Sequence, residues 1–237
     1  MKNWSVMSDS PIAAMFDRIS PKYDRLNHLL SFNIDKIWRR KTAKAVSINH
    51  PRTILDLATG TADLAIELAK CNPQARIIGM DISKKMLEIG KEKVKQQGLE
   101  SQIELRMGDA AALPFGDNSS DAVTVAFGVR NFEKMEQGLS EICRVLKPNG
   151  IAYILEFSMP EKFPIKQAYK LYFKHILPII GKQVSKDAWA YSYLPESVER
   201  FPKPSVFLQM LNNNGLFEAT ARHLTCGIAT LYSVRKR

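Results

Sequence analysis

The chain has 237 residues, of which 45% are hydrophobic and 24% charged, so it can bury a sizeable core and has the composition of a soluble globular protein. It contains neither an apolar run long enough to cross a bilayer nor a signal-peptide-like N-terminus, and its three scattered cysteines favour neither a disulfide framework nor a metal site; we therefore expect a protein of the reducing cytosol. The formal net charge of +10 predicts an anionic partner: nucleic acid, a membrane surface or an anionic ligand.

The first 50 residues are predicted to form helices. Apolar residues recur at helical spacing in two stretches, one before and one after Ser20-Pro21, and the proline is expected to end the first helix. Tyr23 and Asp24 place polar groups beside aliphatic ones, as a lid over a substrate requires. Residues 1–50 are therefore interpreted as a helical lid, with a plain pair of surface helices as the alternative.

Residues 52–157 alternate between apolar runs and helical patterns. The pattern predicts helices near 61–71, 83–97 and 134–146, and strands near 53–57, 76–80, 102–107, 121–126 and 150–157. Ser83 is a suitable N-cap and Gly98 a suitable stop for the second helix, and residues 147–150 form a turn. This rhythm predicts an α/β fold with a largely parallel sheet, covered by helices on both faces.

The rhythm is interrupted at residues 158–200, which contain four prolines and one helical piece. That piece carries a lysine every four residues opposite a crowded apolar side, a pattern typical of a helix on a membrane surface or of an ordinary surface helix; the lysines are Lys162, Lys166, Lys170 and Lys174. The segment is interpreted as an insertion that covers the site. Residues 201–237 are predicted to form a helix and an antiparallel hairpin, so that residues 1–237 make a single domain.

The first strand ends at Asp56 and leads into a turn of small residues around Gly60. A second strand ends at Asp81, 21 positions beyond Gly60, where an acid is well placed to bind ribose hydroxyls. The turn lacks the further glycines that a pyrophosphate needs and the Lys-Ser/Thr pair of a P-loop. These absences disfavour a nicotinamide-dependent oxidoreductase and favour S-adenosylmethionine, which has a ribose and an adenine but no phosphate.

Each polar group of S-adenosylmethionine has a candidate partner in the chain. Asp56 or Asp63 could bind the amino group, and the backbone N–H groups of Gly60 and Thr61 could bind the carboxylate. Asp109, at the end of the third strand, could accept a hydrogen bond from the adenine amine. Because carboxyl ends of parallel strands meet at one edge of a sheet, these residues are expected to surround one ligand.

Three segments resemble the menaquinone/ubiquinone biosynthesis C-methyltransferase family, and they are residues 23–39, 127–132 and 144–158. The resemblance covers nearly the whole chain. It implies a Rossmann-like class I S-adenosylmethionine-dependent methyltransferase fold, with a mostly parallel seven-stranded sheet, a C-terminal antiparallel hairpin and helical lid elements.

The resemblance also implies which residues act. Carried over position by position, the family's cofactor contacts fall on Thr61, Asp81, Asp109 and Ala110. The implied reaction is methylation of a ring carbon of a reduced demethylmenaquinone, a naphthoquinol with a polyprenyl tail. Arg130 and Asn131 are the first candidates for stabilising the phenolate-like charge, with help from Tyr23 and Asp24. A structural turn is the plain alternative for Arg130 and Asn131.

The sequence departs from the family pattern at three single positions and in the turn of residues 58–63, which is poorer in glycine than the turn common in members that also serve ubiquinone. Asn33 and Asn149 stand where glycine is usual, and asparagine tolerates the left-handed backbone that glycine adopts. Ala126 stands where many members that also serve ubiquinone have serine. The differences favour a naphthoquinol substrate over a polyprenyl benzoquinol, which stays the first alternative.

A substrate dissolved in the bilayer would explain why the chain carries a basic amphipathic segment. Residues 162–182 are predicted to dock the enzyme peripherally on the inner face of the cell membrane, with no nucleic acid as partner and a homodimer left open. Two other functions remain alternatives: an O- or N-methyltransferase for another small aromatic, and a basic nucleic-acid-binding protein, although no nucleic-acid motif is present.

Overall fold

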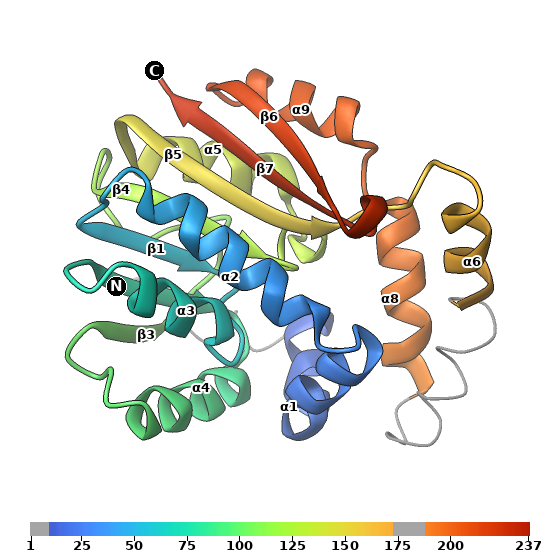
Figure 1. Ribbon diagram of the computed structural model, residues 1–237. Coiled ribbons are helices and arrows are strands. Elements are labelled where there is room, and N and C mark those ends of the chain that lie inside the picture. The colour runs from blue at the N-terminus through green and yellow to red at the C-terminus, as the bar shows by residue number, and fades with distance from the viewer. Residues whose placement is uncertain (1–9, 173–187) are drawn as a thin grey trace.

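The protein is built around one mixed sheet, seen in the computed structural model, which describes residues 10–172 and 188–237 (Figure 1). Its seven strands lie in the order β3-β2-β1-β4-β5-β7-β6. Their bounds are β1 (Thr53–Leu57), β2 (Arg76–Asp81), β3 (Ile103–Met107), β4 (Ser120–Ala126), β5 (Leu146–Phe157), β6 (Leu216–Leu224) and β7 (Ala229–Lys236). Strands β1 to β5 pair with one another in parallel, whereas β7 is antiparallel to both β5 and β6. The predicted parallel core and C-terminal hairpin are confirmed.

Helices cover both faces of the sheet. One apolar cluster joins the sheet to α2 (Ile34–Ser47), α3 (Asp63–Cys71) and α4 (Lys84–Gln96), and a second joins it to α5 (Met135–Val145) and α9 (Pro204–Asn213). In β1, Ile54 belongs to the first cluster and Leu55 and Leu57 to the second, as the alternation of side chains along a strand requires. The caps of α4 are as predicted: Ser83 accepts a hydrogen bond from Met86 N–H, and Gly98 has a φ of 66°.

The N-terminal helical region differs from the prediction at Pro21. Helix α1 (Pro11–Leu30) continues through the proline instead of ending before it. A proline removes the N–H that would bond to the carbonyl four residues earlier, here that of Asp17. The Ser20 hydroxyl donates to that carbonyl at 3.1 Å, so the carbonyl keeps a partner and the helix continues. A left-handed Asn33 (φ 60°) then turns the chain into α2, as expected for an asparagine in a glycine position.

The remaining differences lie at chain reversals. The turn predicted at residues 147–150 is an irregularity inside β5, where Ser120 pairs with Leu146 and the register then shifts; Asn149 has a φ of 65° there. Helix α6 (Ile165–Leu171) follows Pro164 as expected. Helix α8 (Ala188–Arg200) was not predicted, and it runs through Pro195 while burying Val198. The end of the predicted basic helix, with Lys174, lies outside the described residues.

The strand order reverses between β1 and β4, which lie side by side. From β1 the chain builds the sheet outward through β2 and β3, and from β4 it continues on the other side with β5. Crevices at such a reversal, beyond the carboxyl ends of the strands, bind ligands in open α/β sheets. In Figure 1, α1 lies beyond this end of β1, beside α4 and the start of α2. Within the described residues, no helix combines the length and apolar character needed to cross a bilayer.

Candidate functional site

A cavity of about 390 Å³ lies at the strand reversal, within the range typical of small-molecule sites. Its floor comes from the ends of β1, β2 and β4, and its roof from the start of α1 and the segment after β4. The roof is tied together at Ser10, whose hydroxyl donates to Glu133 Oε1 at 2.6 Å. Gly60 lines the floor with a φ of 57° and has no atom within 4 Å of the position that a Cβ would take, so the turn leaves room for a ligand.

Asp81 is the polar centre of the cavity floor. Its two carboxylate oxygens accept hydrogen bonds from the backbone N–H groups of Gly60 and Ser83, each at 2.8 Å. Burial raises the pKa of Asp81 to about 6, against the opposing effect of these N–H groups. The carboxylate is therefore held rigidly beside the glycine turn, where it can accept hydrogen bonds from a diol.

The loop after β3 forms the neighbouring wall. Asp109 and Ala110 both line the cavity, together with apolar Ile82 and Met86 from the end of β2 and the start of α4. Asp109 Oδ1 accepts a hydrogen bond from Ala111 N–H at 2.9 Å, which holds the loop at the strand end. An apolar slot with an exposed carboxylate at its rim suits a flat, amine-bearing base.

Two of the candidate cofactor residues point away from this cavity. Asp56 is 1% exposed, and its carboxylate accepts hydrogen bonds from the hydroxyls of Thr59 at 2.6 Å and Thr124 at 2.5 Å. Burial raises the pKa of Asp56 to about 6, although both hydroxyls oppose the rise. Thr61 directs its hydroxyl to Asp24. Because both side chains are occupied, only their backbone groups remain available to a ligand in the cavity.

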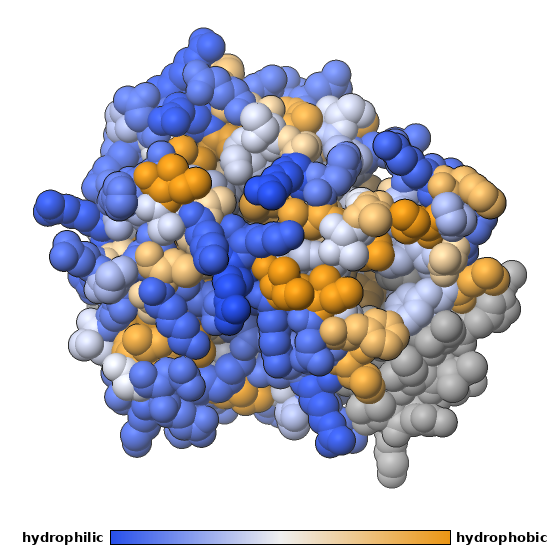
Figure 2. All heavy atoms as spheres, viewed as in Figure 1, coloured by the Kyte–Doolittle hydropathy of each residue, from blue (hydrophilic) through white to orange (hydrophobic). Residues whose placement is uncertain are grey.

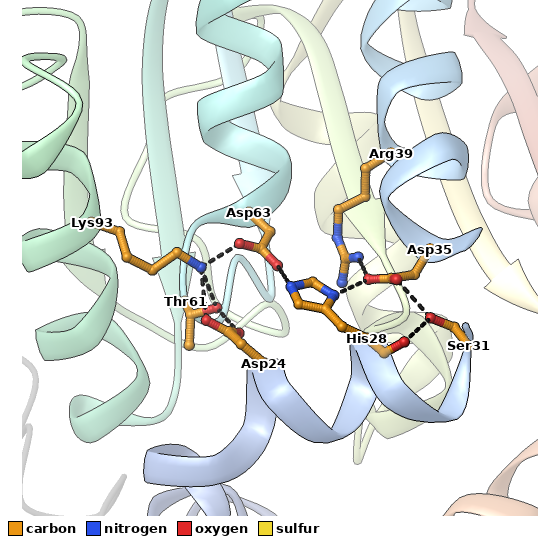
Figure 3. Close-up of polar contacts among 8 residues, drawn as sticks. All are labelled: Asp24, His28, Ser31, Asp35, Arg39, Thr61, Asp63 and Lys93. Atoms are coloured by element: carbon orange, nitrogen blue, oxygen red, sulfur yellow. Dashed lines mark hydrogen bonds and ion pairs between the residues drawn. The ribbon is translucent and has the colours of Figure 1, made fainter. Parts of the chain in front are cut away.

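Asp24 belongs to a chain of charges that ties the lid to the core (Figure 3). Lys93 Nζ lies 2.8 Å from Asp24 and also pairs with Asp63, so that α1, α3 and α4 meet at one ammonium group. The row continues through His28, which bonds to Asp35 at 2.8 Å, while Arg39 pairs with the same carboxylate. Asp24 thus faces this network and does not line the cavity.

The same row brings three potential metal ligands together, namely one atom each of His28, Asp35 and Asp63 within 4.8 Å of one another. Each carboxylate already has a cationic partner, Arg39 for Asp35 and Lys93 for Asp63. Although burial acts to raise it, the Arg39 guanidinium, the Ser31 hydroxyl and His28 hold the pKa of Asp35 below its usual value. The cluster is therefore neutralised by the protein's own cations, and we assign it no metal.

Tyr23 and Asn131 also line the cavity. Burial raises the pKa of Tyr23, although Arg130 and Arg39 act to lower it, so the phenol stays protonated at neutral pH. Asn131 Oδ1 accepts from the Tyr193 hydroxyl at 2.9 Å, which orients the amide. Its Nδ2 makes only a long bond of 3.4 Å to the Phe127 carbonyl, so the amide can still donate to a ligand.

Arg130 is occupied by a buried partner. Its guanidinium pairs with Glu156 at 2.6 Å and donates to the Phe127 carbonyl at 2.6 Å, with the two charged side chains 7% and 0% exposed. Arg130 does not line the cavity. Its bonds instead brace the turn that presents Asn131, which is the structural role weighed for it in the sequence. Direct contact between Arg130 and a substrate stays a prediction.

Sequence reasoning missed Glu156, Lys93 and Tyr193. Glu156 could have been found, because it is a single acid at the carboxyl end of the apolar strand β5, the same signal that marked Asp56 and Asp81. Lys93 is one of many lysines on α4, and Tyr193 lies in a segment without regular spacing. Their partners are far away in the sequence, so no local pattern distinguishes them.

Similar proteins align with most of this chain. A profile of the ubiE/COQ5 methyltransferase family matches residues 4–236. The chain is 45% identical to a demethylmenaquinone methyltransferase of Bacteroides fragilis, over 95% of this chain and 92% of that protein. It is 42% identical to a ubiquinone/menaquinone biosynthesis C-methyltransferase of Geobacter sulfurreducens, over 95% and 88% of the two chains.

Solved structures of similar fold include a SAM-dependent methyltransferase from Aquifex aeolicus, with a TM-score of 0.58 and 18% identity over 78% of this chain and 82% of that one. The [4+2]-cyclase SpnF is also similar, with a TM-score of 0.63 and 19% identity over 85% and 81% of the two chains. At such identities the likeness concerns the fold alone, and a cyclase among the neighbours shows that this fold by itself does not determine a reaction.

Proposed function

This chain belongs to the ubiE/COQ5 methyltransferase family, and on that premise we propose that it methylates a ring carbon of a polyprenyl demethylnaphthoquinol, giving menaquinol. The cofactor of the family is S-adenosylmethionine. The observation that carries the proposal is the cavity at the strand reversal, whose lining combines a rigid carboxylate beside a glycine turn with a phenol and an amide.

The residues present fit this cofactor. Asp81 would accept the ribose hydroxyls, and Asp109 with the backbone of Ala110 would bind the adenine against Ile82 and Met86. The Gly60 N–H is already donated to Asp81, which corrects its expected role, so the Thr61 N–H just before α3 would bind the methionine carboxylate. When bound, S-adenosylmethionine supplies an electrophilic methyl group on a sulfonium.

The part of the cavity lined by Tyr23 and Asn131 is suited to a quinol. A phenolic carbon becomes a strong nucleophile when the neighbouring hydroxyl loses its proton, so the site must orient that oxygen and stabilise its negative charge. The Asn131 amide and the protonated Tyr23 phenol can both donate to it. Arg130 acts indirectly: it holds the turn through its ion pair with Glu156 and adds a positive charge near the oxygen.

The test is methyl transfer from labelled S-adenosylmethionine to demethylmenaquinone, with and without a chemical reductant. We expect transfer only in the reduced sample, because the quinone ring is electron-poor and the quinol ring is electron-rich. A polyprenyl benzoquinol lacking the methyl group serves as the competing substrate. Transfer to the benzoquinol without transfer to the naphthoquinol would contradict the substrate assignment, and transfer to neither would contradict the proposed function.

Asn131→Ala tests the role of the amide. Removing one donor to a developing oxyanion typically costs on the order of a hundredfold in kcat. We expect a loss of about that size with the affinity for S-adenosylmethionine unchanged, because Asn131 lines the part of the cavity suited to a quinol. Asn212→Ala, at an exposed position on α9, is the matched control. An unchanged kcat, or a loss confined to cofactor affinity, would contradict the assignment.

A further inference from the structure

A second hollow of about 280 Å³ lies behind the cavity, and we call it the apolar groove. It is formed where α1, α2, α6, α8 and the loop between β6 and β7 come together. Its surface is largely aromatic and aliphatic, with Phe32, Ile34, Trp38, Phe157, Ile165 and Tyr169 among the lining residues. The residues named so far as cofactor or quinol contacts do not line it.

The polar atoms in the groove wall have partners of their own. The Trp38 indole N–H donates to the Thr225 hydroxyl at 2.8 Å, which satisfies two lining residues at once. The Ser31 hydroxyl donates to Asp35 at 2.6 Å, away from the groove. A ligand there meets few open donors or acceptors, so the groove favours a hydrocarbon over a polar molecule.

The groove and the cavity share a wall. Phe127 lines the cavity, and its ring stacks on that of Phe157, which lines the groove, with 4.4 Å between the centroids. The Trp38 ring, which lines the groove, packs against the Phe127 ring with 6.0 Å between the centroids. Along α1, Tyr23 lines the cavity and Asn27, one helical turn later, lines the groove. A molecule whose ring lies at Tyr23 can therefore extend along α1 directly into the groove.

The far end of the groove opens among exposed apolar side chains. Phe32 is 71% exposed and Leu171 59% exposed, and they belong to segments that line opposite sides of the groove. Figure 2 shows hydrophobic residues gathered over the junction of α1 and α2. Large exposed apolar side chains grouped in this way mark a surface that meets a partner or a lipid.

We propose that the apolar groove binds the polyprenyl tail of the substrate, holding the isoprene units nearest the quinol ring while the rest of the tail stays in the membrane. The inference rests on the proposed function, since it is the quinol that carries such a tail. An unsaturated, hydrogen-bond-free chain matches the aromatic lining, and the face of α1 from Tyr23 to Asn27 gives the chain its path past the stacked Phe127 and Phe157 rings. The groove thus contributes to KM for tailed substrates only.

Ala168→Phe tests the groove by filling it. Ala168 is an exposed residue of α6 that lines the groove, so a larger side chain there occupies the space without replacing core contacts. We expect KM for a tailed demethylnaphthoquinol to rise at least tenfold, while KM for the tailless quinol and the affinity for S-adenosylmethionine change less than twofold. Gln167→Phe, its exposed neighbour on the same helix and outside the lining, is the control. Equal changes for both substrates, or none for the tailed one, would overturn the inference.

Binding of geraniol, a two-isoprene alcohol, separates the groove from the reaction. Calorimetry should detect geraniol binding to the wild-type protein and to Gln167→Phe, with at least tenfold weaker binding to Ala168→Phe. If no quinol is methylated but geraniol still binds in this pattern, the proposed function fails and the groove assignment stands. If quinol is methylated but Ala168→Phe alters neither geraniol binding nor KM for the tailed substrate, the groove assignment fails alone.

Discussion

Among single residues, three carboxylates lie near the carboxyl ends of β1, β2 and β5 but have different tasks. Asp81 faces the cavity, whereas Asp56 is enclosed by two threonine hydroxyls and Glu156 is paired with Arg130. Side chains alternate between the faces of a sheet, so the position along the strand decides which surroundings an acid meets. A strand-end acid in an α/β sequence is therefore a sign of burial, and only its direction makes it a ligand contact.

The raised pKa of Asp81 predicts that cofactor binding depends on pH. The ribose needs the ionised carboxylate, so with a pKa of about 6 the Kd for S-adenosylmethionine should rise about tenfold between pH 7.5 and pH 5. Because the folded-state pKa is raised from 3.8, the stability that Asp81 contributes is present below pH 3.8 and is lost as pH rises through 6; weaker binding at pH 5 is thus not unfolding caused by this group.

Calorimetry from pH 7.5 to pH 5 is the measurement for Asp81. Asp81→Asn is the comparison, and it should bind weakly at every pH with no slope, because its side chain does not titrate. The role of Asp81 would be disproved by a wild-type Kd that is constant over this range, or by an Asn variant with wild-type affinity at pH 7.5.

The buried pair of Arg130 and Glu156 predicts a stability effect. Glu156→Gln leaves an uncompensated guanidinium in the interior and should lower the free energy of unfolding by about 3 kcal/mol. Glu104→Gln, at a pair whose members are 64% and 41% exposed, is the control and should cost less than about 1 kcal/mol. Urea denaturation measures both. A loss for Glu156→Gln no larger than that for the control would mean that the pair does not hold the turn.

Among the elements, α1 is fastened to the core at its start and at its middle by different polar contacts. Its start is tied to the segment after β4 through Ser10 and Glu133, and its middle to α3 and α4 through Lys93. Asp17 also accepts from the Ser83 hydroxyl at 2.5 Å, at the first turn of α4. These contacts are polar and partly exposed, so the lid is held in place by bonds that can open without disturbing the apolar core.

Lys93→Met should loosen the lid. The change removes the cation shared by Asp24 and Asp63 and leaves two carboxylates facing each other across α1 and α3. We expect amide hydrogen exchange in residues 11–30 to become about tenfold faster, with a higher KM for the quinol. Lys91→Met, at an exposed position on the same helix, should leave both unchanged. Unaltered exchange in Lys93→Met would show that the ammonium does not anchor α1.

At the scale of the whole molecule, the net charge of +10 and the exposed apolar side chains raise the question of where the protein meets a membrane. Lys162 and Lys166 are exposed at the start of α6, beside Phe163, which is 80% exposed, and Leu171. Phe32 lies across the groove from this helix. Basic groups around apolar ones suit an anionic lipid surface, so docking would place the groove mouth against the bilayer.

Charge reversal tests this orientation on vesicles of phosphatidylcholine with phosphatidylglycerol at low ionic strength. Each lysine near an anionic surface contributes about 1 kcal/mol, so a variant with Lys162, Lys166, Lys170 and Lys174 changed to Glu should bind at least about tenfold more weakly. The control carries the same change at four exposed lysines of α4, namely Lys84, Lys85, Lys91 and Lys95. Equal losses in the two variants, or none in either, would rule out docking through residues 162–182.

The sheet, its hairpin and the glycine turn after β1 could all be predicted from the sequence. These are local or periodic features: a strand shows in its alternation, a cap in one residue, and a left-handed turn in the asparagines at 33 and 149. The continuation of α1 through Pro21 was missed because the Ser20 hydroxyl replaces the lost hydrogen bond, and no periodic pattern records such a replacement.

The contacts of each candidate side chain depend instead on how distant elements pack. It turned Asp24 towards Lys93, 69 positions away, and Arg130 towards Glu156, 26 positions away. It also set the groove against the cavity, using residues as far apart as Trp38 and Thr225. Burial strengthens the attraction between these charges and the hydrogen bonds between these groups, and burial is a property of the packed chain. The sequence could therefore name the acids and bases of the site, whereas their partners emerge only when distant elements pack together.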